Sequence, residues 1–132
     1  MSMRKICLFG SLLLCAALAA CSPAKPTVTK LEAKDSGSTV HMKEGDTLEI
    51  SLEGNTSTGY TWEPLPDSGA LLAQQGDGQY VANSAVGSGG IMTFTFKAVQ
   101  PGSAGLQLIY HRPFEPTEPP SQTFNLNIVV DQ

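Results

Sequence analysis

Apolar and polar residues alternate in four stretches of the chain. In the clearest of them, Leu48, Ile50 and Leu52 are separated by polar residues, so their side chains share one face of a strand. The same period of two recurs at Met92, Phe94, Phe96 and Ala98, at Leu106, Leu108 and Tyr110, and at Phe124, Leu126, Ile128 and Val130. No stretch shows a convincing helical period. The pattern therefore predicts an all-β domain.

Weaker strands are expected over residues 27–33, around Val40 and Met42, over residues 60–63, and between residues 70 and 83. Glycine, proline, asparagine and aspartate separate these segments, as turns require. Seven or eight strands in a domain of this size predict an immunoglobulin-like antiparallel β-sandwich. Trp62, the one tryptophan of the chain, is expected to pack between the two sheets.

Three segments interrupt the strand pattern: residues 54–60, 84–90 and 111–121. Consecutive antiparallel strands alternate in direction. If residues 70–83 form one strand, the three segments are the first, third and fifth connections after strand 47–53, and all of them emerge at the same end. A hairpin at Gly76-Asp77-Gly78 would break this parity; we favour a bend or bulge there. Three loops at one end of a rigid sandwich form an arrangement suited to binding.

The first twenty residues form a separate segment. Arg4 and Lys5 precede an apolar run that is too short to span a membrane, which is typical of a signal peptide. The following Leu18-Ala19-Ala20-Cys21 resembles the lipobox of bacterial lipoproteins. That resemblance implies removal of residues 1–20, lipidation of Cys21, a tether over residues 21–26 and a folded domain over residues 27–132. The alternative is an ordinary signal peptide with a chance cysteine.

The lipobox also implies a location. Ser22 after the cysteine favours the outer membrane, so we expect a lipid-anchored protein that faces the periplasm of a Gram-negative bacterium. Cys7 and Cys15 would leave with the signal peptide, and lipid would occupy Cys21. The mature domain would then have no thiol for a disulfide, a nucleophile or a metal site.

Charge and residue types limit the chemistry. Eight lysines and arginines stand against twelve acidic residues, which makes nucleic-acid binding improbable. Catalysis could draw on His41, His111 and Ser57, but no orienting acid is evident in the sequence, with Asp77 and Glu115 left open. Two histidines without ligand spacing do not predict a metal site. We expect no enzyme activity, no cofactor and a monomer.

The three loops carry the most unusual local sequences of the chain. They read Asn55-Thr56-Ser57-Thr58-Gly59-Tyr60, Gly87-Ser88-Gly89-Gly90 and Arg112-Pro113-Phe114, in that order. This set resembles the chagasin-type inhibitors of papain-like cysteine proteases, whose pattern is Asn-Pro-Thr-Thr-Gly-Tyr/Phe, Gly-x-Gly-Gly and Arg-Pro-Trp. Three positions depart from the pattern, because Thr56, Ser57 and Phe114 replace proline, threonine and tryptophan.

The resemblance implies a reversible, non-covalent inhibitor that fills a protease cleft. The segment 56–59 would act as a wedge beside the catalytic cysteine and histidine of the protease. The glycine loop would lie where the cleft receives residues that precede the scissile bond, and Arg112-Pro113-Phe114 would lie on the opposite side. Two alternatives stay open: an aromatic at 114 that folds back on the core, and an envelope module that binds another protein or a glycan through the same loops.

Overall fold

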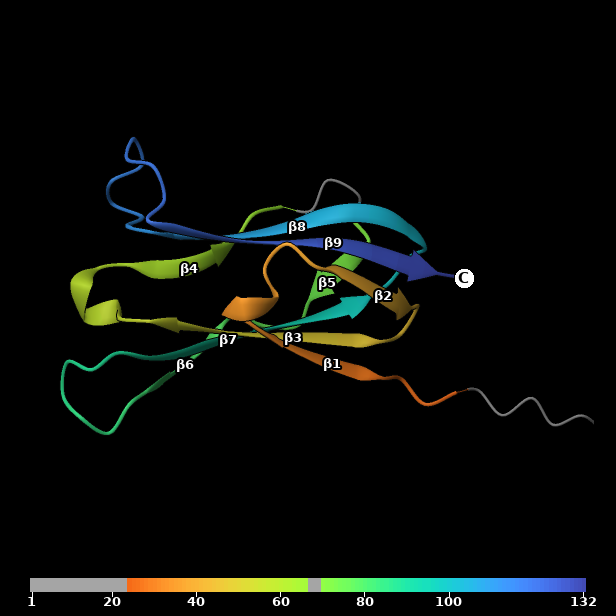
Figure 1. Cartoon of the computed structure of the whole chain (residues 1–132), viewed down its shortest axis with the longest axis horizontal. Helices are drawn as coiled ribbons and strands as arrows, with labels where there is room; N and C mark the ends of the chain where they lie inside the picture. Colours follow the sequence, from red (N-terminus) through yellow and green to blue (C-terminus); the bar gives the residue numbers. More distant parts are fainter. Residues whose placement is uncertain (1–23, 67–69) are drawn as a thin grey trace, which may run out of the picture.

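Two β-sheets face each other in the computed structural model, which describes residues 24–66 and 70–132 (Figure 1). The signal segment and Cys21 lie outside the described residues. The elements in chain order are β1 (Val28–Glu32), the 3₁₀ turn η1 (Ala33–Asp35), β2 (Thr39–Lys43), β3 (Thr47–Gly54), the 3₁₀ turn η2 (Thr56–Thr58), β4 (Thr61–Pro64), β5 (Leu72–Gln74), β6 (Gln79–Ala82), β7 (Gly90–Ala98), β8 (Gly102–His111) and β9 (Gln122–Asp131).

The sheet order confirms the expected all-β sandwich. One sheet has the order β1-β3-β7-β5, with β6 also paired to β7, and the other has the order β2-β9-β8-β4. Nine strands are described rather than seven or eight, because the segment 70–83 counts as two. Both β5 and β6 pair antiparallel with β7, β5 near its end and β6 near its beginning. Residues 75–78 therefore form a bulge in one interrupted edge strand, not a hairpin.

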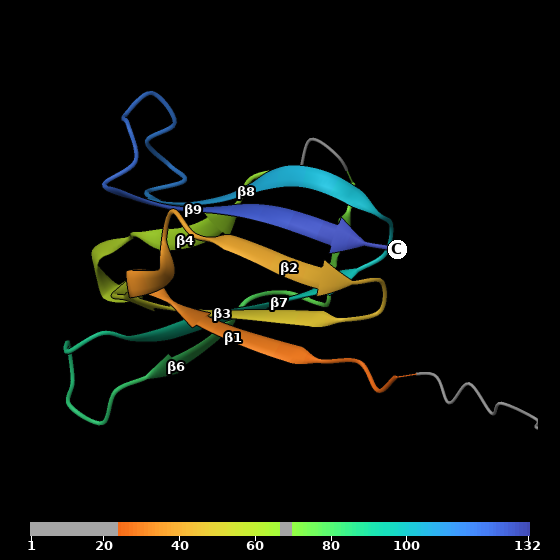
Figure 2. The same ribbon diagram turned by 45° about the vertical axis from the view of Figure 1, so that its right-hand side comes forward.

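Two edge strands depart from the antiparallel pattern. β1 pairs with β3 in parallel, and β2 pairs with β9 in parallel. Between them, η1 carries the chain from one sheet to the other (Figure 2). Backbone hydrogen bonds hold this crossing, since Gly37 donates to the Asn125 carbonyl and Asn127 donates to the Ser38 carbonyl. The first two strands therefore cover one edge of each sheet.

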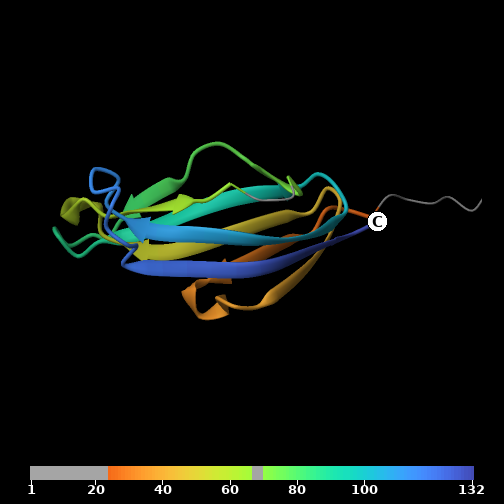
Figure 3. The ribbon, with the colours of Figure 1, turned by 90° about the horizontal axis from the view of Figure 1, so that it is seen from above.

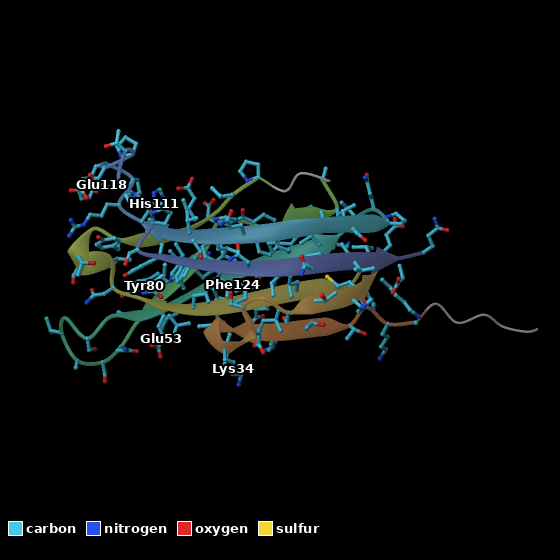
Figure 4. All side chains as sticks on the ribbon, turned by 45° about the horizontal axis from the view of Figure 1, so that its top comes forward. Lys34, Glu53, Tyr80, His111, Glu118 and Phe124 are labelled. Carbon is cyan, nitrogen blue, oxygen red and sulfur yellow. The ribbon has the colours of Figure 1, made fainter. Side chains whose placement is uncertain are left out.

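The alternating side chains meet between the sheets. The predicted inward residues of β3, β7, β8 and β9 are buried, except that Met92 is only partly buried. Trp62 is 6% exposed and belongs to the same cluster, which confirms its expected place in the core. Phe124 of β9 points between the sheets (Figure 4) and is 1% exposed. No polar or charged residue in the described part of the chain is buried, so packing of apolar side chains stabilises the sandwich.

The long axis of the sandwich separates two different ends. Seen from above, the three long loops gather at one end, whereas the beginning of β1 and the C-terminus lie at the other (Figure 3). The strand register agrees. Val28 at the start of β1 pairs with Thr47, the first residue of β3, whereas the β3–β4 loop follows Gly54, the last residue of β3. Within the described residues, no helix has the length and apolar character needed to cross a membrane.

Asp46 holds the segment just before β1 at the end of the sandwich opposite the loops. One carboxylate oxygen accepts the Thr27 N–H at 2.8 Å and the other accepts the Lys43 N–H at 2.8 Å. The hydrogen bond from Lys43, followed by that from Thr27, holds the pKa of Asp46 below its ordinary value. Because the folded pKa is depressed, this stabilisation is present above the ordinary carboxyl pKa and is lost as the pH falls through the lower, folded value.

Replacing Asp46 with alanine is therefore expected to lower the melting temperature by a few degrees at neutral pH. The difference from the wild type should begin to shrink below about pH 4, where the carboxyl of the unfolded protein takes up a proton, and should be lost at the lower pH at which the folded carboxylate is protonated. Thermal denaturation followed by circular dichroism at a series of pH values measures both effects. Asp77→Ala removes another exposed carboxylate and is the control. A difference in melting temperature between the wild type and Asp46→Ala that is the same at every pH would contradict this role of the ionised Asp46 carboxylate.

Candidate functional site

The three unusual loops lie together at one end of the sandwich. They are the β3–β4 loop (residues 55–60), the β6–β7 loop (83–89) and the β8–β9 loop (112–121), all on the left in Figure 1. Register explains the clustering, because Gly90 pairs with both Gly54 and Ala82, and Thr61 pairs with His111. The structure thus brings together all the loop residues that the sequence predicted for binding.

The β3–β4 loop is a tight turn fixed by its own side chains. The Asn55 side chain accepts hydrogen bonds from the Ser57 backbone N–H at 3.2 Å and the Ser57 hydroxyl at 2.5 Å. Thr58 donates from its hydroxyl to the Asn55 carbonyl at 2.6 Å. Gly59 ends the turn in the left-handed region at φ 82°, which an L side chain adopts only with strain. Thr56, Ser57 and Thr58 remain exposed on this narrow turn.

Hydrogen bonds join the β3–β4 loop to both of its neighbours. The Asn55 side-chain amide donates to the Gly87 carbonyl of the β6–β7 loop at 3.1 Å. On the other side, Nε of Arg112 donates to the Thr58 carbonyl at 3.2 Å. These two hydrogen bonds therefore hold the β3–β4 loop, which is the central loop of the three, in a fixed position between its neighbours.

Tyr110 supports the central loop from below. Its hydroxyl accepts the Asn55 N–H at 2.8 Å. Its ring packs against those of Tyr60 and Trp62, whose centroids lie 5.2 and 5.1 Å from its own. Trp62 in turn donates from its indole N–H to the Glu53 carbonyl at 2.9 Å. Three aromatic rings and two hydrogen bonds therefore join the base of the loop to the core.

Arg112 is engaged within the domain. Its guanidinium carbon lies 4.5 Å from the centre of the Tyr60 ring, and Nη1 lies 3.4 Å from a carboxylate oxygen of Glu115. With the bond to Thr58, these contacts make Arg112 a support for the central loop. The Arg-Pro-Phe motif predicts Arg112 only as a contact with a partner, and the contacts of its side chain within the domain are additional to that prediction.

Phe114 is an exposed aromatic residue of the Arg-Pro-Phe segment, in which Pro113 is exposed as well. It is 68% exposed, so the alternative of an aromatic folded back on the core does not hold. The edge of its ring covers Gly59, where an added Cβ would lie 2.9 Å from the ring. The ring thus keeps a defined place beside the central loop. Further along the same loop, Glu118 lies away from the sheets (Figure 4).

The glycine loop approaches the central loop closely. At Gly89, whose φ is 83°, a Cβ would lie 2.8 Å from the Gly54 carbonyl oxygen. Gly89 therefore has to lack a side chain so that the β6–β7 loop can pack against Gly54, in addition to any role in contact with a partner. The glycine pattern of the sequence predicts only the surface role.

The histidines and Ser57 do not form a catalytic set. Nε2 of His111 lies 2.6 Å from a Glu63 carboxylate oxygen, across β4 and β8, and the Ser57 hydroxyl is bonded to Asn55 instead. His41 lies 4.0 Å from Asp131 at the opposite end. In the part of the chain that the structure describes, no three His, Cys, Asp or Glu side chains come together as metal ligands. The candidates for catalysis are therefore scattered.

Comparison with known proteins agrees with the loop geometry. The model of the family described as "Chagasin family peptidase inhibitor I42" matches residues 41–128, which include all three loops. The chain belongs to this family. Its members are inhibitors of peptidases and not enzymes.

Relatives of this chain extend over most of its length. Amoebiasin-1 of Entamoeba histolytica is 30% identical over 101 residues, which cover 73% of this chain and 93% of the relative. The crystal structure of the cysteine protease inhibitor EhICP2 from Entamoeba histolytica has a TM-score of 0.73 at 22% identity, covering 82% of this chain and 99% of the other. The structure of PbICP-C in complex with falcipain-2 has a TM-score of 0.58 at 22% identity, covering 80% and 99%.

Two residues of this end were missed by the sequence analysis. Tyr110 was read only as an inward strand residue, and nothing in the pattern shows that its hydroxyl reaches Asn55. Val86 precedes the predicted glycine segment and is fully exposed. An apolar residue in a loop that is otherwise small and polar was the available signal.

Removal of the Tyr110 hydroxyl tests the support of the central loop. Tyr110→Phe keeps the stacked rings but leaves the part-buried Asn55 N–H without its acceptor, which should lower the free energy of unfolding by about 1–2 kcal/mol. Chemical denaturation measures this loss, and amide hydrogen exchange should quicken at Asn55 and Thr58. Tyr80→Phe removes the hydroxyl of another partly buried tyrosine, on the edge strand β6, and is the matched control. Unchanged stability and unchanged exchange in Tyr110→Phe would contradict the assigned role.

Proposed function

We propose that this protein is a reversible, non-covalent inhibitor of papain-like cysteine proteases that occupies the active-site cleft with its three loops. The observation that carries the proposal is the linked loop end of a chagasin-family chain: the β3–β4 turn is hydrogen-bonded to both flanking loops. A partner surface therefore meets the three loops as one preformed unit, which lowers the entropy lost on binding.

The geometry of the central turn suits inhibition without cleavage. A protease cleaves a peptide that lies extended across its catalytic residues, whereas residues 56–58 are curled into a 3₁₀ turn and closed by the hydrogen bond from the Gly59 N–H to the Thr56 carbonyl. The turn can enter a cleft and cover a catalytic cysteine and histidine without presenting an extended scissile bond. The relative PbICP-C, solved with falcipain-2, supports a protease as the partner.

The departures from the family pattern are compatible with this function. A proline at position 56 would limit the conformations of the unbound loop. Without it, ordering the loop costs about 0.5–1 kcal/mol more in conformational entropy. The Asn55, Ser57 and Thr58 side chains supply a comparable restriction through their hydrogen bonds. Phe114 retains an exposed aromatic ring at the position of the tryptophan. We therefore propose that all three predicted segments, residues 55–60, 87–90 and 112–114, contact the protease.

Titration of residues 22–132 against papain, with a fluorogenic substrate, tests the proposal. We expect stoichiometric inhibition that is reversed on dilution, with the inhibitor recovered intact. A protein that is folded by circular dichroism but leaves papain active at micromolar concentration would contradict it, and would favour the envelope-binding alternative.

Thr56 offers a site-specific test, because its side chain is exposed on the turn and its carbonyl alone closes it. Thr56→Glu adds bulk and charge to the part that enters the cleft, so the inhibition constant should rise by about 100-fold with the fold intact. Ser103→Glu places the same change on an exposed residue of β8 at the opposite end, and should leave inhibition unchanged. Equal inhibition constants for the two variants would exclude the central turn from the interface.

We propose further that the protein is a monomer held by lipid at Cys21 in the outer membrane of a Gram-negative bacterium, facing the periplasm. The lipobox motif supports this placement. So does the place where the described part of the chain begins, because Ala24 lines a hollow with Asp131 and Gln132 beside the C-terminus, and the C-terminus lies at the end opposite the loops (Figure 3). An anchor there would leave the loops free to meet a soluble protease.

The mass of the N-terminal peptide after expression in a bacterial host should show a lipidated Cys21, with Cys21→Ala as the control. An unmodified Cys21 or cleavage elsewhere would contradict the anchor.

A further inference from the structure

Charged side chains surround the loop end of the sandwich but are absent from its centre. Residues 55–60 and 83–89, which form the β3–β4 and β6–β7 loops, contain no charged side chain. An uncharged centre with a charged periphery is typical of surfaces that bind another protein. Over residues 53–63, 79–91 and 108–122, which are the loops with the strand ends beside them, the lysine, arginine and acidic side chains are Glu53, Glu63, Arg112, Glu115 and Glu118.

The opposite end of the sandwich has a different balance of charge. The segments 24–30, 43–47, 97–102 and 131–132 meet there, because the strand register pairs Thr47 with both Val28 and Lys97, and Lys43 with Asp131. These segments carry four lysines and three acidic side chains. The loop end, with four glutamates and one arginine, therefore has an excess of negative charge that the opposite end lacks.

Glu53 and Glu118 make no ion pair within the described residues, whereas the other two glutamates of the loop end pair with His111 and Arg112 at 2.6 and 3.4 Å. Both unpaired side chains are exposed. They lie on opposite sides of the loop end, with Glu118 above and Glu53 below in Figure 4. Their carboxylates are therefore available to a partner on both sides of the central loop.

A groove beside Glu53 has the shape and lining to take a basic side chain. A hollow of about 550 Å³ is lined by residues of η1 and β3, and also by Trp62, Ile91 and Gln122. Glu53 and Gln122 line a second hollow as well, of about 300 Å³, which reaches Asn55. The groove therefore continues onto the loop end. Apolar Ile91 and Trp62 suit the aliphatic stem of a lysine or arginine, and the Glu53 carboxylate suits its charge.

The other charges of this groove are already matched. Lys34 and Glu32, which line the same hollow, lie 3.2 Å apart and form an ion pair. Glu53 is therefore the charge of the groove that remains for a partner.

We propose that the loop end selects proteases with basic side chains around the active-site cleft, and that Glu53 and Glu118 contact those side chains. The inference rests on the proposed function and extends it to two residues outside the three loop motifs. Charges at the rim of an interface act mainly on the rate of association, because attraction begins before contact and exposed ion pairs add little affinity. The selection therefore takes the form of faster association at low salt.

The test compares papain with papain whose surface amino groups have been succinylated, which replaces each positive charge with a negative one. Both preparations are first titrated for active sites, and progress curves with a fluorogenic substrate then give the association rate constant of residues 22–132. At about 0.01 M salt, we expect the wild type to associate about tenfold more slowly with the succinylated enzyme. At about 1 M salt, where charges are screened, the two rate constants should agree.

Two double variants locate the effect. Glu53→Lys combined with Glu118→Lys should lose the preference for untreated papain, because these positions would then repel a basic rim. Glu44→Lys combined with Asp131→Lys makes the same change of net charge at the opposite end and should keep the preference. Both variants should retain the wild-type melting temperature within a few degrees, because all four side chains are exposed.

Equal association of the wild type with both forms of papain at low salt would overturn the proposal. A preference that persists in the Glu53 and Glu118 variant would overturn it too. So would its loss in the Glu44 and Asp131 variant, because net charge and not the position of the glutamates would then be the cause. A wild-type protein that inhibits neither form of papain would instead count against the proposed function itself, so the two failures are distinguishable.

Discussion

The hydrogen bond between the Tyr110 hydroxyl and the Asn55 N–H is the contact on which the loop end depends. Tyr110 belongs to β8 in one sheet, and Asn55 follows β3 in the other, so this bond closes the sandwich between its sheets at the point where the loops begin. The rings of Tyr60 and Trp62 both pack against the same phenol. The apolar core and the polar turn above it are therefore one continuous structure.

Rigidity of this kind has a direct consequence for binding. The central turn has lost the proline of its family pattern, yet its side chains, the Arg112 guanidinium and the Gly87 carbonyl restrain it from three directions. Loops that are ordered before binding lose less entropy when they meet a partner. Arg112, which the sequence predicts at the interface, also supports the turn from within the domain. The Phe114 ring and residues 56–58 of the turn remain exposed.

Much of the fold could be predicted from the sequence, because alternation with a period of two directly reflects burial of one strand face. Leu48, Phe94 and Phe124 lie in the core for that reason. The common end of the loops followed from parity alone. The parallel pairing of the two edge strands could not be predicted, since it depends on a crossing between sheets at η1. The hydrogen bonds from Asn55 to Tyr110 and from Arg112 to Thr58 were equally hidden, because each joins residues more than fifty positions apart.

Backbone ¹⁵N relaxation of the free domain tests the central claim most directly, because it reports the order of the loop before any protease is present. If the aromatic support and the side-chain hydrogen bonds hold the central turn, residues 55–59 have order parameters near those of the strands, about 0.85. Order parameters below about 0.6 across the same residues would show that the turn is flexible in the free protein. That result would contradict a preformed binding end.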